Sequence, residues 1–163
     1  MENKMPFLGK INCRDFWKID YHLHLNGDGI SELLTGPVIQ EENVDPYIYD
    51  LYTLVNGAPV HLKSSWLRGR MYLAPEGRIY VSSLQQGTYK YDLFEVAGGA
   101  SELKLYKRFT TDGVNSSLTA MDENGGERQL DPGENSDDYK TFCGETQITE
   151  IAFRPLTEWY AFK

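Results

Sequence analysis

The sequence predicts an all-β protein in which one antiparallel meander closes into a β-barrel, with one or two short helices. Between residues 70 and 110, apolar side chains recur at every second position over four consecutive stretches. This is the period of strands with one buried face. Turn sequences separate the stretches, among them Ala74-Pro75-Glu76-Gly77 and Gln85-Gln86-Gly87. A two-sheet β-sandwich is the alternative architecture.

Length and composition indicate a single soluble domain that spans residues 1–163. Apolar residues make up 40% of the chain and charged residues 25%. The net charge is −8, and Lys and Arg never occur more than two in a row, so we expect neither nucleic acid nor a membrane as partner. No apolar run reaches the roughly 18 residues of a transmembrane helix. Residues 1–10 lack the apolar core of a signal peptide, and we therefore expect a cytoplasmic protein.

Cys13 and Cys143 are the two cysteines, and they form no CxxC motif. In a reducing compartment we expect both to be free thiols. A disulfide between them stays open at this point, because separation in sequence says nothing about separation in space.

The first half of the chain divides into a lead-in segment (1–15), a strand and a hairpin. In the predicted strand 16–25, Trp17, Ile19 and Tyr21 share one face, and His22 and His24 share the other. Residues 30–34 are predicted to form a single helical turn. Residues 47–55 and 59–66 are predicted to pair as a hairpin around Asn56-Gly57, the strongest turn signal in the chain.

The second half contains short strands and one helix. We predict strands at 116–121 and 127–130, a mobile acidic loop at 131–138, and a short helix at 136–142 capped by Ser136. Residues 146–153 and 156–162 are predicted to be the strands that close the barrel.

The meander offers two faces, and the more apolar one is predicted to fill the core. That face carries Met71, Leu73, Ile79, Val81, Leu93, Leu103 and Leu105. The mixed face, with Tyr80 and Tyr106, is predicted to meet solvent, as is usual for a half-buried antiparallel sheet. Tyr89, Tyr91 and Phe109 are predicted to point inward with the apolar set.

Aromatic residues are the unusual part of the composition. They make up 13% of the chain, including 11 tyrosines, and many fall on predicted strands. A buried tyrosine hydroxyl needs a hydrogen-bond partner, so a wall of tyrosines suits a half-apolar cavity. The predicted ligand-binding residues are Trp17, Tyr21, Trp66, Tyr89, Tyr91 and Phe109.

The histidines do not predict a metal site. His22 and His24 lie on one face of a strand, and His61 is the third histidine in the chain, on a different strand. A zinc site built from the three is geometrically possible, but a polar strand face is the preferred interpretation. We predict no metal and no cofactor, and no catalytic residue is assigned.

The predicted function is to hold a small hydrophobic or aromatic molecule in an aromatic-lined cavity. Lipocalin-like barrels are the architectural comparison, and it rests on the predicted fold alone. Two alternatives stay open. The same cavity could serve a cofactor-free cyclase, isomerase or lyase. Alternatively, the acidic chain could be a protein-binding module of the inhibitor or immunity type with a basic protein partner.

Overall fold

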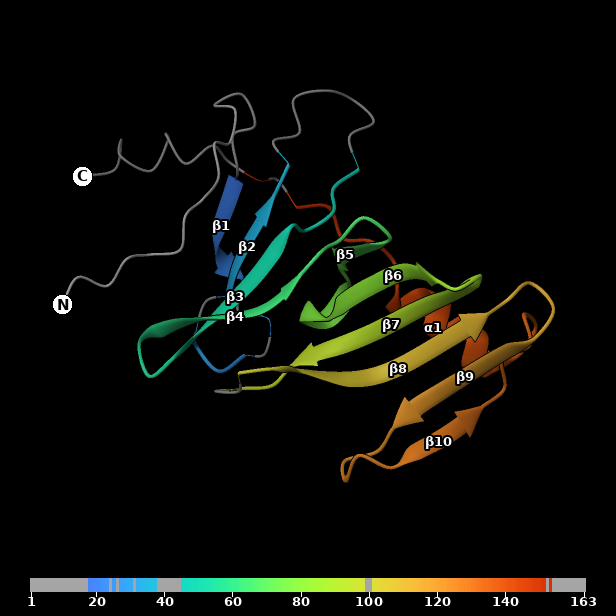
Figure 1. Ribbon diagram of the computed structural model, residues 1–163. Helices are drawn as coiled ribbons and strands as arrows, with labels where there is room; N and C mark the ends of the chain where they lie inside the picture. Colours follow the sequence, from blue (N-terminus) through green and yellow to red (C-terminus); the bar gives the residue numbers. More distant parts are fainter. Residues whose placement is uncertain are drawn as a thin grey trace.

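The computed structural model describes residues 18–23, 25, 27–30, 32–37, 45–98, 101–151 and 153, and it shows an all-β protein with two antiparallel sheets (Figure 1). Sheet A has the order β1-β2-β3-β4, with bounds Lys18–Leu23, Glu32–Gly36, Asp50–Val55 and Ala58–Ser64. Sheet B has the order β10-β9-β8-β7-β6-β5. In chain order its bounds are Gly69–Leu73, Ile79–Gln85, Thr88–Val96, Leu103–Thr111, Ser116–Met121 and Glu127–Leu130. A short 3₁₀ turn, Pro75–Gly77, joins β5 to β6, and the helix α1 spans Asp137–Glu145.

The predicted closed barrel is not found among the described residues. Closure required the first strand to pair with the last, but β1 pairs with β2 and β10 pairs with β9, so each ends its sheet. The two sheets meet through a single backbone bridge, in which Ile48 N donates to Met71 O at 2.7 Å. The chain passes from sheet A to sheet B in the bend between β4 and β5. The all-β class is confirmed, with two separate antiparallel sheets in place of one closed barrel.

The predicted turns and most strands are confirmed. Asn56 and Gly57 both have left-handed φ values, of 52° and 77°, as a two-residue hairpin turn requires. Gln86 and Gly87 repeat this geometry between β6 and β7, at 51° and 82°. Ser136 caps α1 as predicted, because its hydroxyl accepts from Tyr139 N at 3.0 Å.

Two predicted elements are wrong. Residues 30–34 were expected to form a helical turn, but Glu32 begins strand β2, where its neighbours alternate between buried and half-buried. In residues 146–151 and 153 there is no strand. That segment lies against sheet B instead, with Thr149 N donating to Leu73 O at 2.8 Å. The second predicted closing strand, 156–162, and the lead-in segment, 1–15, lie outside the described residues.

The acidic loop 131–138 is tied by several hydrogen bonds. Asp131 N donates to Asp138 Oδ2 at 3.0 Å, and the Ser136 hydroxyl donates to Asp131 O at 2.8 Å. Gly133 N donates to Asp131 Oδ1 at 2.9 Å. The last two residues of the predicted loop already belong to α1.

The larger core lies between the two sheets. It joins side chains of β2 and β3 in sheet A to side chains of β5 and β6 in sheet B, and Phe153 completes it from the C-terminal segment. Six of its members are fully buried: Leu34, Ile48, Leu51, Met71, Ile79 and Phe153. Gly36 is needed here, because a Cβ at this position would come within 2.4 Å of the Phe153 ring.

The pairing of β6 with β7 corrects the predicted faces of the meander. Tyr80 lies opposite Leu93, and Ser82 lies opposite Tyr91. Residues directly opposite in a sheet point to the same side. Tyr91 and Leu93 therefore share the face of Tyr80, and Val81 points the other way into the inter-sheet core. The prediction that Tyr89, Tyr91 and Leu93 lie with Ile79 and Val81 is wrong.

The second core lies on the other face of sheet B, under α1 (Figure 1). A row of aromatic rings crosses the strands here, with centroids 5.9 Å apart between Tyr72 and Tyr80, 6.4 Å between Tyr80 and Tyr91, and 6.0 Å between Tyr91 and Phe109. From the helix, Phe142 packs against Phe109 at 6.0 Å. Tyr139 adds an edge contact to Phe109 at 5.3 Å. The aromatic row is thus part of a helix-covered core.

Ion pairs fasten the end of α1 to the sheet. Lys107 is buried, and its ammonium lies 2.5 Å from Glu145 Oε2. Arg78 reaches the other Glu145 oxygen at 3.9 Å and also pairs with Glu76 and Glu95. Glu145 therefore compensates a charge on β8 that has little access to water.

We predict that Glu145→Ala lowers the free energy of unfolding by about 2 to 4 kcal/mol, because it leaves the Lys107 charge buried without a carboxylate. Lys140→Ala, an exposed change on the same helix, should stay within about 0.5 kcal/mol of the wild type. Chemical denaturation of both variants measures the difference. Equal small effects would mean that this ion pair does not hold the helix.

Alkaline pH provides a second test of the helix-covered core. Burial, with the nearby Tyr91 second, raises the pKa of Tyr80 to about 12. The folded state then keeps a proton that the unfolded chain, with a tyrosine pKa near 10, releases. Stability that is fully present below about pH 10 is therefore lost as pH rises toward about 12.

From about pH 9 to pH 11, the free energy of unfolding should fall by about 1 kcal/mol less in Tyr80→Phe than in the wild type, because the variant has no hydroxyl to ionise. Urea denaturation at the two pH values measures it. The same loss in wild type and variant would show that Tyr80 ionises as readily in the folded protein as in the unfolded chain.

Candidate binding site

The predicted site residues that the structure describes lie in two places. Tyr89, Tyr91 and Phe109 lie in the aromatic row on sheet B, where Tyr89 stacks on Tyr91 at 6.3 Å. Trp66 stands apart from this row, in the bend after β4. Trp17 lies outside the described residues, as does the side chain of Tyr21.

No described hollow is lined by Tyr91 or Phe109. Phe109 is buried and Tyr91 is half-buried, both among neighbours from α1 and the adjacent strands. The interior that the sequence assigned to a ligand is filled, in this part of the chain, by side chains of the protein itself.

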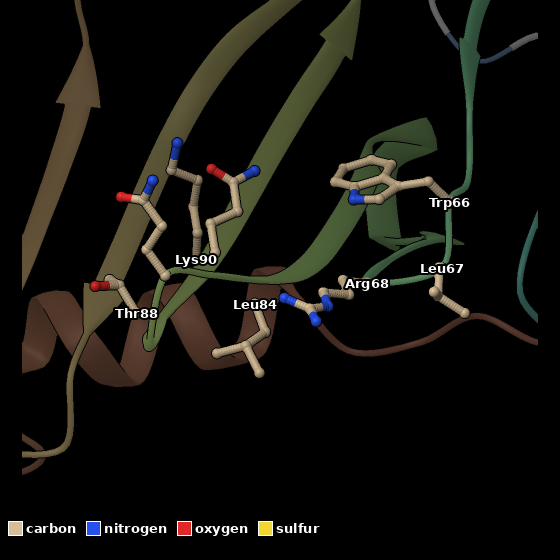
Figure 2. A pocket seen from close by; sticks show the side chains of 8 residues that line it. Trp66, Leu67, Arg68, Leu84, Thr88 and Lys90 are labelled. Atoms are coloured by element: carbon tan, nitrogen blue, oxygen red, sulfur yellow. The ribbon is translucent and has the colours of Figure 1, made fainter.

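An open cleft of about 620 Å³ lies instead where the bend after β4 meets the hairpin between β6 and β7 (Figure 2). Figure 2 shows Trp66 and Leu67 on the bend, with Leu84 and Lys90 on the strands across from them. Arg68 lies between the two sides. The remaining lining residues are Gln85, Gln86 and Thr88.

Local hydrogen bonds and a glycine fix the bend. Trp66 N donates to Gly69 O at 2.8 Å, and Gly69 N donates back to Trp66 O at 3.0 Å. A Cβ at Gly69 would lie 2.1 Å from the indole ring, so only glycine lets the Trp66 ring fold back over the start of β5. Leu84 N donates to Arg68 O at 2.9 Å and ties the bend to β6.

A smaller hollow of about 180 Å³ adjoins the cleft. Leu67, Arg68 and Leu84 line both, and the smaller one extends to Tyr72 and Tyr89. Together they form one region that runs around the edge of sheet B, with Leu84 and Tyr89 on the face that carries Tyr80, and with Lys90, opposite Ser83, on the other face. We call it the Leu67 surface. It consists of Trp66, Leu67, Arg68, Leu84, Tyr89 and Lys90.

The Leu67 surface gathers most of the large apolar side chains that are exposed in the described part of the chain. Leu67 is 97% exposed, Tyr89 48%, Trp66 42% and Leu84 36%. These are four of the seven large apolar residues that are exposed in the described ranges; the others are Leu54, Val114 and Ile148. Contiguous exposed apolar side chains rimmed by polar ones mark binding sites in soluble proteins.

The surface is also cationic. Arg68 and Lys90 both line the cleft, and no carboxylate of the described residues forms an ion pair with either. The Lys63 ammonium lies 5.6 Å from the Trp66 ring centroid, a cation–π contact at the border of the surface. Positive charge thus concentrates here in a chain whose net charge is −8.

A polar cluster on the outer face of sheet A has the residue types of a hydrolytic triad. The Ser64 hydroxyl lies 2.9 Å from His61 Nε2 and 2.5 Å from Asp50 Oδ1. Asp50 Oδ1 is itself 3.5 Å from the same histidine nitrogen. In a working triad the carboxylate orients the opposite ring nitrogen, and the serine proton goes to the histidine. Here Ser64 and Asp50 both lie at His61 Nε2, so the carboxylate does not orient the opposite ring nitrogen as a triad requires.

Of the residues on the Leu67 surface, the sequence analysis named Trp66 and Tyr89 and did not name Leu67, Arg68, Leu84 or Lys90. The predicted placement of His22 and His24 on one strand face stays a prediction, because His24 and the side chain of His22 are outside the described residues. In the described part of the chain, no group of three or more His, Cys, Asp or Glu is arranged to hold a metal ion. Cys143 is a free, exposed thiol on α1, and Cys13 is outside the described residues, so its state stays a prediction.

The described part of the chain contains no helix that is both long and apolar enough to cross a membrane. Comparison with known proteins identified no matching family model, no similar curated protein and no similar solved structure.

Proposed function

We propose that the protein is a binding module and that a segment of another protein docks on the Leu67 surface. The observation that supports this most is the convergence of four exposed large apolar side chains with two cations at one edge of sheet B. Burying a fully exposed leucine gains about 1.5 to 3 kcal/mol, so a partner that covers Leu67 is favoured.

The backbone around this surface indicates how a partner would bind. β5 is the end strand of sheet B, but backbone groups on its outer edge already have hydrogen-bond partners. Met71 O accepts from Ile48 N, Met71 N donates to the Ser65 hydroxyl, and Leu73 O accepts from Thr149 N. A partner strand therefore finds few open backbone groups along β5. Recognition rests on the side chains of the Leu67 surface and the hollows beside them.

A small hydrophobic or aromatic molecule is the second candidate ligand. The cleft volume of about 620 Å³ is within the usual range for small-molecule sites, and the Trp66 ring offers a flat apolar wall. Such a ligand would lie in the open cleft, because the aromatic row under α1 is already packed. For the alternative of a cofactor-free enzyme, the lining of this cleft contains no His, Asp or Glu that could act as acid or base.

The partner predicted from net charge was basic, whereas the Leu67 surface favours the opposite sign. A basic partner would have to approach another part of the molecule, such as the acidic region 122–138. That interaction stays a prediction, independent of the surface described here.

A random-peptide display library tests the proposal. Peptides selected on the wild type should bind Val114→Asp equally well and bind Leu67→Asp at least about 10-fold more weakly, because a carboxylate in place of Leu67 removes the apolar anchor. Val114 is 89% exposed in a turn far along the chain, so its variant carries the same added charge at an exposed position. Fluorescence anisotropy with labelled peptides measures the affinities.

A selection that yields no binding peptide would contradict the proposal. Peptides that bind Leu67→Asp as tightly as the wild type would also contradict it, because the recognised surface would then be elsewhere.

A further inference from the structure

We infer that the segment that docks on the Leu67 surface is acidic as well as apolar. This rests on the proposed function and adds the chemistry of the partner. The described arginines differ in whether they form ion pairs with carboxylates.

Most of the described arginines already have carboxylate partners. Arg70 pairs with Asp45, Arg78 with Glu76 and Glu95, and Arg108 with both oxygens of Asp92. Arg68 is exposed and forms no ion pair with a described residue. The chain has 24 acidic residues for 16 basic ones, so acidic side chains are the more numerous kind. An arginine left without one at an apolar surface is available to a partner.

Lys90 provides the second available cation. It lies on β7 opposite Ser83, is half-buried and lines the cleft. Arg68 belongs to the bend after β4, on the other side of Leu84 (Figure 2). The two charges therefore come from different elements and line the same cleft.

The sign of the partner's charge affects the free energy of docking. A partner that covers Leu67 and Leu84 also removes water from Arg68 and Lys90, and an ion that loses water without gaining a counter-charge costs free energy. Carboxylates on the partner offset that cost, whereas lysines add repulsion to it. The surface therefore favours an acidic apolar segment and disfavours a basic apolar one.

The Leu67-dependent peptides from the library selection provide the test. Their sequences should be enriched in Asp and Glu relative to the input library, next to large apolar residues. Their affinity should fall at least about 10-fold on the double variant Arg68→Gln/Lys90→Gln, and the fall should shrink as salt is added. The matched control is Lys104→Gln/Arg128→Gln, which removes two exposed cations without ion pairs in the described chain and changes the net charge equally. It should bind like the wild type.

The two proposals can fail separately. Leu67-dependent peptides that lack acidic enrichment, or that bind Arg68→Gln/Lys90→Gln as tightly as the wild type, would overturn the acidic partner and leave the docking surface in place. Equal losses on both double variants would assign the effect to net charge and also overturn the inference. A selection without Leu67-dependent peptides would overturn both.

Discussion

Sheet B is apolar on both faces, and the rest of the structure depends on covering both. One face, with Met71 and Ile79, packs against sheet A. The other, with Leu93 and Phe109, packs under α1. An antiparallel sheet usually leaves one face to solvent, so a sheet with two apolar faces needs a second layer on each side. On the face away from sheet A, this layer is the nine-residue helix α1, which is held by Phe142 and by the Glu145 ion pairs.

This constraint decides where a ligand can bind. Because α1 packs Tyr139 and Phe142 onto the aromatic row, the row contributes to stability in the way a core does. Large apolar side chains stay exposed in the bend after β4 and at the hairpin between β6 and β7, where Leu67 is 97% exposed and Leu84 36%. Four of the seven large apolar side chains exposed in the described ranges are at that edge, Leu67 above all. Binding is proposed at the edge of the sheet because the faces are already used.

The meander could be predicted from the sequence because period-two patterning and turn chemistry are local. The faces of its strands could have been predicted too. A two-residue turn at Gln86-Gly87 places Gln85 opposite Thr88, so odd-numbered residues of β6 lie opposite even-numbered residues of β7. Grouping Val81 with Tyr91 ignored this rule. The irregular pairing after Leu93, where Phe94 lies opposite Leu105, is a tertiary feature that the pattern does not encode.

The Leu67 surface was harder to predict, because it is formed by two segments, 66–68 and 84–90, that lie apart in the sequence. Trp66 and Leu67 come at the end of the predicted strand 59–66, and the bend that Gly69 allows leaves both exposed. The charges of Arg68 and Lys90 are ordinary in the sequence. They become informative once the structure shows which cations already have carboxylates.

Mapping a Leu67-dependent peptide onto the protein by amide chemical shifts tests most directly whether binding occurs at the sheet edge. We expect the perturbed amides to cluster at residues 66–70 and 84–90. Perturbations centred on Tyr91, Phe109 and residues 139–142 would show that the ligand enters the helix-covered core, and would contradict a binding site at the edge.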